Sequence, residues 1–364
     1  MKRIKAAFLA WLVLTGLIYV MNGSKAAAAM FIVALVYCVL AFAAVMISGR
    51  KLKPRIVIGS GADKNKESKV VLSAESGSKI PVPSCRIDIA CENVLTKEKE
   101  TVTEELLPGL KGKDSTELSV TSPYCGMIGI SAEDAVISDP VGLFSRKQKM
   151  SAGTELYVMP EISEVGIPED FLDSYDMESY TYSQYRKGSD PGEVFGIREY
   201  QDGDSPKQIH WKLSAKLDDM IVKIPSYPIE NKLIILLDNS IPEGAELSAE
   251  ERSGLMEYFF SISHILIGKN ITHSLGWCDH RSGSFIVRRV ESDGDMWAAV
   301  PEALSAGIEQ SGMSTAYRFL SASGDEHFTN HFIVTCFDPR DTEMLAEYGE
   351  VRTFRKQQKA EHIN

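Results

Sequence analysis

The chain has 364 residues, with 39 Lys plus Arg against 50 Asp plus Glu, so its formal net charge is −11. A single hydrophobic core stops growing at roughly 250 to 300 residues, so this length predicts more than one domain. Hydrophobic residues at 44% and charged residues at 24% are ordinary for globular proteins. These proportions exclude a mostly disordered chain, a collagen-like chain and a small disulfide scaffold.

Charge is distributed unevenly along the chain. Residues 1–50 hold five basic and no acidic side chains, which leaves 34 basic and 50 acidic side chains, a net charge of −16, for the remainder. Affinity for nucleic acid depends largely on Lys and Arg that neutralise phosphates. We therefore exclude nucleic acid as a partner.

Two uncharged stretches follow each other at the start of the chain. Residues 6–21 comprise sixteen residues and residues 26–47 comprise twenty-two, with only four residues between them. A helix crosses a bilayer core with about 20 apolar residues, and the lower limit is about 17, which the first stretch reaches if neighbouring lysine stems snorkel. We predict that residues 1–50 form a hairpin of two transmembrane helices that contacts the lipid bilayer. The alternative for the first stretch is a cleaved signal peptide, but no small-residue cleavage site with a polar mature start follows it.

Basic residues around these stretches predict the orientation. Seven of them flank the outer ends of the hairpin, whereas the connection has Lys25 alone. By the positive-inside rule, we expect a multi-pass protein of the plasma membrane with both termini and the soluble domains in the cytoplasm. The six cysteines show no dense or paired spacing, which is expected of reduced cytosolic thiols. The flanking residues are Lys2, Arg3, Lys5, Arg50, Lys51, Lys53 and Arg55.

The body of the chain divides into two regions with different patterns. Residues 51–160 contain short apolar alternations between Gly, Ser, Asn and Lys clusters, which predicts an antiparallel, immunoglobulin-like β-sandwich. From residue 232, buried-strand runs alternate with helical patterns, and Ser248 with Glu251 forms a candidate capping box. Residues 232–364 are therefore predicted to form an α/β domain with a largely parallel sheet and helices on both faces.

The individual elements follow from the same patterns. Predicted strands of the first region include residues 69–72, 87–91, 118–120, 127–130 and 135–137. In the second region we expect strands at 233–238, 271–277, 284–290 and 331–338, and helices that start near 248, 295, 315 and 342.

Between the two regions, the connecting segment 161–231 has few regular patterns. It contains a cluster of tyrosines among acidic and polar residues: Tyr175, Tyr180, Tyr182 and Tyr185. One interpretation is a docking surface, because Tyr offers contact area at low entropic cost. The other is a segment packed across the α/β domain with its phenol groups in water.

Residues 188–225 hold many residue types at fixed offsets, in the stretch GSDPGEVFGIREYQDGDSPKQIHWKLSAKLDDMIVKIP. This stretch resembles the signature of the bacterial family called domain of unknown function 58, and residues 139–144 (DPVGLF) and 155–160 (ELYVMP) are similar to further elements of that family. The matching signature residues are Arg198, Glu199, Tyr200, Gly203, Asp204, Ile209, Trp211, Lys212, Ser214, Ala215 and Lys216.

The resemblance implies an architecture and a setting. It implies two membrane spans, a β-sandwich and a carboxyl-terminal domain similar to von Willebrand factor A domains. It also implies partners, since such proteins are associated with MoxR-type AAA+ ATPases and with transglutaminase-like membrane proteins in maturation of the cell envelope or of protein complexes.

The signature residues also have a physical interpretation of their own. Gly203 permits a backbone conformation that other residues resist, and Asp204 is a candidate cap for a helix that begins near Ser205. Ile209 is expected to seat that helix on the core, and Trp211 is expected to be buried with a partner for its indole N–H. These roles describe a rigid structural corner at least as well as a binding or catalytic site.

Two apolar runs end in aspartate, at Asp238 and Asp338, and the carboxyl edge of an open α/β sheet is where ligands bind. In von Willebrand A domains the first strand ends in Asp-x-Ser-x-Ser and helps to hold magnesium, which makes Asp238, Ser240 and Asp338 weak metal candidates here. The third motif position is Pro242, which has no side-chain oxygen, whereas Mg²⁺ requires near-octahedral oxygen coordination. We expect no cofactor, with magnesium as the alternative.

Catalytic constellations are weaker still. Cys278, Asp279 and His280 are consecutive, so Asp279 points away from the face that the other two share on an extended chain. Around His210 no nucleophile and carboxylate can be placed. We expect a non-enzymatic, membrane-anchored binding protein whose α/β domain presents its strand-end face to a protein partner. The alternatives are a divalent-metal-dependent membrane-bound hydrolase and a purely architectural envelope protein.

Overall fold

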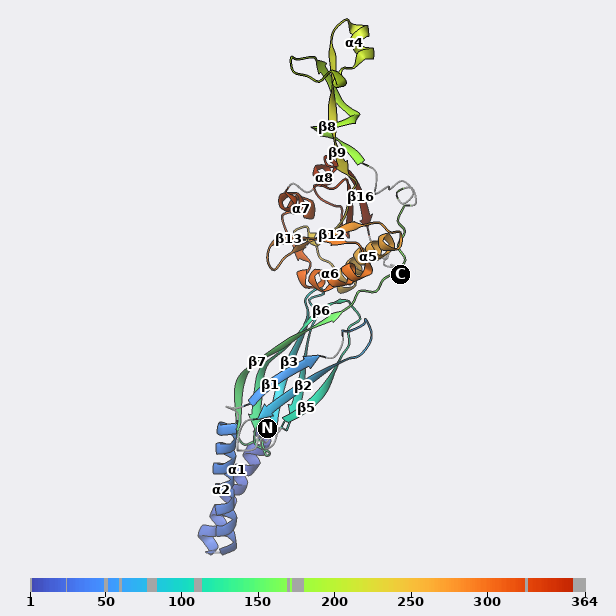
Figure 1. Cartoon of the computed structure of the whole chain (residues 1–364). Coiled ribbons are helices and arrows are strands. Elements are labelled where there is room, and N and C mark those ends of the chain that lie inside the picture. The colour runs from blue at the N-terminus through green and yellow to red at the C-terminus, as the bar shows by residue number, and fades with distance from the viewer. Residues whose placement is uncertain are drawn as a thin grey trace. The chain divides into compact units, whose positions relative to one another are not determined.

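The computed structural model describes residues 2–23, 25–48, 52–58, 61–76, 84–107, 113–168, 171, 180–324 and 327–355 (Figure 1). The chain divides into two compact units, Met1–Pro160 and Glu161–Asn364. It is a mixed α/β protein whose sheets are mostly antiparallel. All six cysteines are free thiols.

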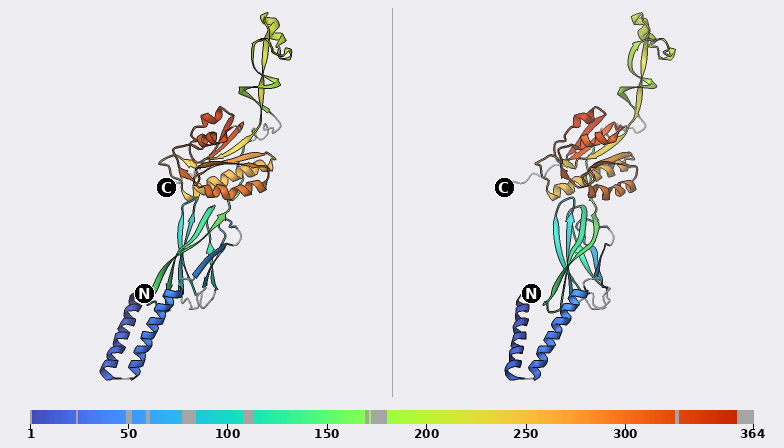
Figure 2. Two further views of the ribbon diagram at one scale, coloured as in Figure 1. Left: turned by 60° about the vertical axis from the view of Figure 1, so that its left-hand side comes forward. Right: turned by 90° about the vertical axis from the view of Figure 1, so that its left-hand side faces the viewer.

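Two helices begin the first unit. α1 (Lys2–Asn22) and α2 (Lys25–Ser48) lie side by side (Figure 2). Within α2, Ala28–Ile47 is long and apolar enough to cross a membrane, and no other helix of the described residues is. The apolar part of α1, Lys5–Met21, is shorter, so length and composition support one span rather than the predicted two. Arg50 and Lys51, which contribute to the predicted orientation, lie outside the described residues.

Two antiparallel sheets form the remainder of this unit, with strand orders β1-β2-β5 and β4-β3-β6-β7. Side chains of both sheets share one hydrophobic core, to which β3 contributes every second residue, from Cys85 through Ile87 and Ile89 to Cys91. Such alternation places one face of a strand on a core. The strands are β1 (Leu52–Ile58), β2 (Ser68–Ser76), β3 (Ser84–Asn93), β4 (Lys99–Leu106), β5 (Lys113–Val120), β6 (Gly126–Ser138) and β7 (Ser145–Val158).

One strand replaces two predicted ones. Residues 127–130 and 135–137, predicted as separate strands, both belong to β6. The register of β6 against β7 shifts between Ala132 and Asp134. A bulge of this kind interrupts the period-two pattern without ending the strand, which is why the sequence suggested a break.

A five-stranded sheet with the order β13-β12-β10-β15-β16 is the centre of the second unit. β10 pairs in parallel with β12 and β15, β15 pairs in parallel with β16, and β13 is antiparallel at one edge. On one face, Ile234 and Leu236 pack with Ala316 and Phe319 of α7. The elements are β10 (Leu233–Leu237), β11 (Ser240–Ile241), α5 (Ala249–Gly268), β12 (His273–Asp279), β13 (Ser284–Val290), α6 (Asp293–Ala306), β14 (Glu309–Gln310), α7 (Thr315–Ser323), β15 (Asn330–Thr335), α8 (Thr342–Ala346) and β16 (Glu350–Arg355).

Helix starts are fixed by local side chains. Ser248 and Glu251 form the predicted capping box of α5, in which each side chain accepts a hydrogen bond from the backbone N–H of the other. Ser292 and Asp295 form a second box, so α6 begins two residues before the predicted start at 295. Satisfying the free N–H groups of the first turn sets these boundaries.

The connecting segment contains a β-hairpin that the sequence analysis did not predict, together with a short helix near the predicted start at Ser205. β8 (Tyr180–Glu199) and β9 (Ile221–Glu230) form an antiparallel hairpin with several register shifts. Residues 200–220 between them, called the tip below, contain the short helix η2 (Pro206–Gln208) and α4 (Trp211–Leu217). Tyr175 lies outside the described residues, and of Tyr180, Tyr182 and Tyr185 only the backbone is described.

Candidate functional site

An ion pair closes the base of the tip. The two terminal guanidinium nitrogens of Arg198 donate to the two carboxylate oxygens of Asp204, each at 2.6 Å. Asp204 also accepts from the backbone N–H of Gln201 at 2.8 Å, and Arg198 donates to the carbonyl of Glu199 at 3.0 Å. The hydrogen bonds from Arg198 lower the pKa of Asp204. This planar, two-point contact fixes the orientation of both side chains.

Local backbone geometry explains why the chain turns here. Gly203 has a φ of 107°, a backbone conformation that is unfavourable for residues with a Cβ atom. The predicted cap at Asp204 is wrong, because η2 begins after Ser205 without a side-chain cap and Asp204 is engaged by Arg198. Instead, His210 caps α4: its Nδ1 accepts from the N–H of Leu213 at 3.3 Å.

Further signature residues tie α4 to β9. The Ser214 hydroxyl accepts from the N–H of Ile221 at 2.9 Å and donates to the carbonyl of His210 at 3.2 Å. The N–H of Tyr200 donates to the carbonyl of Met220 at 2.8 Å, and Ile209 is buried. These residues therefore hold the corner together, as the structural interpretation of the signature predicts.

Trp211 is the exception within the signature. Its side chain is 65% exposed, so the prediction that it is buried is wrong. It is the first residue of α4, a helix of seven residues without a buried side chain, which is too short to turn a broad face onto a core. Other large apolar side chains of the hairpin and of the tip are exposed as well, namely Val194, Ile197, Leu217 and Met220. Glu199 and Lys212 are also exposed.

At the carboxyl edge of the parallel sheet, Asp238 follows β10. Its two carboxylate oxygens accept from the hydroxyl groups of Thr315, at 2.7 Å, and Thr335, at 2.9 Å. Burial raises the pKa of Asp238, and these two hydrogen bonds and the nearby charge of Arg340 act in the opposite direction. Asp238, Thr315 and Arg340 line a cavity of about 10 Å³, which is room for roughly one water molecule.

The magnesium site that the resemblance implies does not fit these residues. Arg340 donates to the carbonyl of Ser240 at 2.7 Å and to that of Ser311 at 3.1 Å, so a fixed positive charge already lies beside Asp238. Ser240 is buried next to the Cys278 thiol, and its hydroxyl has no hydrogen-bond partner among the described residues. Asp338 follows the neighbouring parallel strand but is 96% exposed and paired with Arg355. Among the described residues, no group of three His, Cys, Asp or Glu side chains could hold a metal ion.

Residues Cys278–His280 have a structural role at the same carboxyl edge of the sheet. Burial raises the pKa of the Cys278 thiol, to which Arg318 donates at 3.1 Å. The His280 Nε2 lies 2.9 Å from the carbonyl of Asn239. Asn239 donates to the carbonyls of Cys278, at 2.7 Å, and Gly307, at 2.9 Å. These contacts indicate a structural role and do not form a nucleophile and base.

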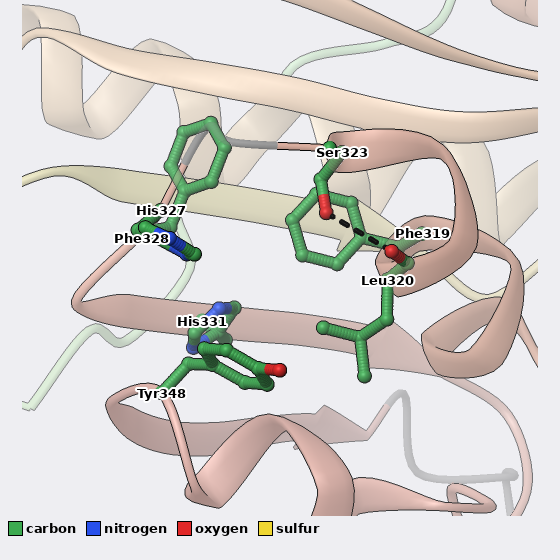
Figure 3. A pocket seen from close by; sticks show the side chains of 8 residues that line it. Phe319, Leu320, Ser323, His327, Phe328, His331 and Tyr348 are labelled. Carbon is green, nitrogen blue, oxygen red and sulfur yellow. Dashed lines mark hydrogen bonds between the residues drawn. The ribbon is translucent and has the colours of Figure 1, made fainter. Parts of the chain in front are cut away.

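A second cavity, of about 40 Å³, lies near the amino end of β15 (Figure 3). His331 lines it, and burial lowers the pKa of this imidazole to about 4. The His327 ring stacks on the ring of Tyr348, with centroids 5.7 Å apart. A neutral imidazole in so small a cavity is suited to packing and not to acid–base catalysis. No motif marks this cavity, so sequence reasoning missed it.

Comparisons with known proteins add little. No protein-family model matches the chain, and no curated protein matches it. Among solved structures it is similar to the CARDB domain of a Pyrococcus furiosus protein in complex with di-metal ions (17% identity, 30% of this chain, 87% of that chain, TM-score 0.22). It is also similar to a cohesin module of a Clostridium perfringens family 33 glycoside hydrolase (10% identity, 30% of this chain, 98% of that chain, TM-score 0.23). TM-scores this low support no argument about function.

Proposed function

We propose that this chain is a membrane-anchored, non-enzymatic binding protein of the domain of unknown function 58 type. In this proposal, α2 and α1 both anchor it in the plasma membrane, and the soluble parts are cytoplasmic. The second unit is a von Willebrand factor A-like domain. The stretch Ala28–Ile47, at 20 residues, supports the anchor, because about 20 apolar residues span a bilayer core.

The observation that supports a binding role is that Trp211 is exposed on a tip whose conformation is fixed by internal hydrogen bonds. Burying an indole side chain is strongly favourable, yet the tip leaves 65% of this one in solvent. The paired Arg198 and Asp204 and the bonds of Ser214 hold the tip in shape before any partner arrives. A pre-organised tryptophan loses little entropy on binding, and tryptophan is enriched among residues that dominate interfaces.

The charge around Trp211 favours a protein partner. Residues 200–220, the tip, contain three basic and four acidic side chains, so the net charge of the tip is −1. A surface that binds anionic lipid headgroups or nucleic acid carries an excess of Lys and Arg. The tip has exposed apolar side chains and no excess of basic residues, which fits a protein interface better.

The family resemblance suggests the partner. We propose a MoxR-type AAA+ ATPase, with a transglutaminase-like membrane protein as a further member of the assembly. The metal-dependent hydrolase is less favoured, because Asp238 is occupied by two threonine hydroxyls and lies beside Arg340. A purely architectural role is the outcome if the tip binds nothing.

Co-purification from native membranes tests the proposal. The full-length protein is extracted in mild detergent, and its partners are identified and quantified for wild type, Trp211→Ala and Trp297→Ala. Trp297 is the matched control, since it is an exposed tryptophan of α6. We expect an AAA+ ATPase with wild type and with the control, and a fall of about tenfold or more with Trp211→Ala.

Each of the other possible results rejects one part of the proposal. If no AAA+ ATPase co-purifies with the wild type, the partner assignment fails. If Trp211→Ala retains every partner at the wild-type level, the tip is not the binding surface.

A further inference from the structure

The turn between β6 and β7 lies along the apolar helix α2. This turn, residues 139–144 (DPVGLF), is called the DPVGLF loop. The Tyr37 hydroxyl of α2 donates to the carboxylate of Asp139 at 3.0 Å. Further toward the end of α2, the rings of Phe42 and Phe144 pack edge to face with centroids 5.5 Å apart. Next to the loop, Arg146 donates to the carbonyl of Met46 at 2.8 Å.

These contacts show how far along α2 the DPVGLF loop extends. Tyr37 precedes Met46 by nine residues, which is about 14 Å of helix at 1.5 Å per residue. The stretch Ala28–Ile47 is 20 residues long, about 30 Å, and so matches the thickness of a bilayer core. If the loop stayed in water, the apolar stretch from Ala28 to Tyr37 would be only about 14 Å long, too short to cross.

Helix α1 independently gives a lower bound on the depth of the DPVGLF loop in the bilayer. The ring of Phe8 lies 6.3 Å from the ring of Tyr37, so the two residues are at one level. Lys5 is the nearest charged residue of α1 and lies three residues, about 4.5 Å, closer to the membrane surface. The carboxylate of Asp139 is therefore between about 5 and 14 Å below the surface, within one leaflet.

The chemistry of the DPVGLF loop suits that depth. A polar group in hydrocarbon must be satisfied within the protein. Asp139, the one charged residue of the loop, is 2% exposed and also accepts from the N–H groups of Val141, at 3.1 Å, and Phe144, at 2.6 Å. The Gly142 N–H donates to the Asp139 carbonyl at 2.9 Å. The two residues that the loop does expose, Pro140 and Val141, are both apolar, and Val141 is 38% exposed.

We propose that the DPVGLF loop inserts into the bilayer and that Val141 contacts lipid acyl chains. Arg146, at the level of Met46, then lies near the headgroups, where arginine is favoured. The soluble sandwich is held to the membrane at two points, through α2 and through its own β6–β7 turn. This inference rests on the membrane anchor proposed above.

Depth-dependent quenching tests the insertion. Val141→Cys is labelled with an environment-sensitive fluorophore in the full-length protein, in a background where the half-buried thiols Cys38 and Cys336 are replaced by alanine. The protein is reconstituted into phosphatidylcholine and phosphatidylglycerol vesicles. Val57→Cys is the matched control, since Val57 is an exposed valine of β1, five strand residues or about 17 Å beyond Leu52.

We expect spin-labelled lipid to quench the label at residue 141 at least about threefold more than the label at residue 57, with the reverse order for aqueous iodide. Equal iodide quenching at the two positions would overturn the insertion and place the loop in water. If the protein instead stays out of the vesicles altogether, the membrane anchor fails. Because the labels are read only on vesicle-bound protein, the two failures are distinguishable.

Discussion

Two buried histidines should make the second unit sensitive to mild acid. His273, at the start of β12, contacts the Ser263 hydroxyl at 2.7 Å and the carbonyl of Ile271 at 2.9 Å, and its side chain is 2% exposed. Burial lowers its pKa to about 4, and burial lowers the pKa of His331 to about 4 as well. In the unfolded chain both titrate near the ordinary value of about 6.5.

The direction in which stability changes with pH follows from proton binding. Below pH 6.5 both histidines bind a proton in the unfolded chain but stay neutral in the folded protein. The free energy of unfolding is therefore highest above about pH 6.5 and decreases as the pH falls toward 4. At pH 5 each histidine costs about 2 kcal/mol, so the pair costs about 4 kcal/mol relative to pH 7. That is a large fraction of the stability of a typical domain, which is about 5 to 15 kcal/mol.

Urea unfolding at pH 7 and pH 5 measures this loss in the purified full-length protein. Intrinsic fluorescence is a suitable signal, since Trp277 is fully buried in β12. The variant His273→Gln should lose about half of the difference between the two pH values, about 2 kcal/mol, because one of the two groups no longer titrates. An unchanged pH difference in His273→Gln would refute the reasoning.

Two further predictions concern packing and orientation. Gly276→Ala should cost about 1 to 3 kcal/mol, measured by the urea midpoint, because the new Cβ would lie 3.0 Å from atoms of both Leu236 and Phe285; Gly268→Ala, with nothing within 4 Å, is the control. Protease added to sealed inside-out vesicles should digest the soluble units, and digestion only in right-side-out vesicles would place them outside the cytoplasm.

Local signals were the predictable part of the fold. The capping box at Ser248 and the strand at Ser284–Val290 depend on residues within a few positions of each other, and both are found where the sequence indicated. The bulge near Ala132 was missed, because an extra residue in one strand is defined only by its partner strand.

The candidate site shows the same limit. Arg198 and Asp204 are six residues apart, and an ion pair of Arg198 within the loop was foreseeable. The exposure of Trp211 was not, because hydrophobic character predicts burial unless the element is too small to have a core. The position of Arg340 beside Asp238 joins residues about a hundred positions apart, which no local pattern records.

The two edges of the five-stranded sheet limit how the second unit can recognise a protein. At β13, Arg288 pairs with Glu302 and Arg289 with Glu291, and β16 carries Arg352 paired with Glu350. Charged side chains along an edge discourage another backbone from adding a strand there. These charges disfavour β-augmentation at either edge of this sheet, and they also protect crowded copies of the protein against joining edge to edge.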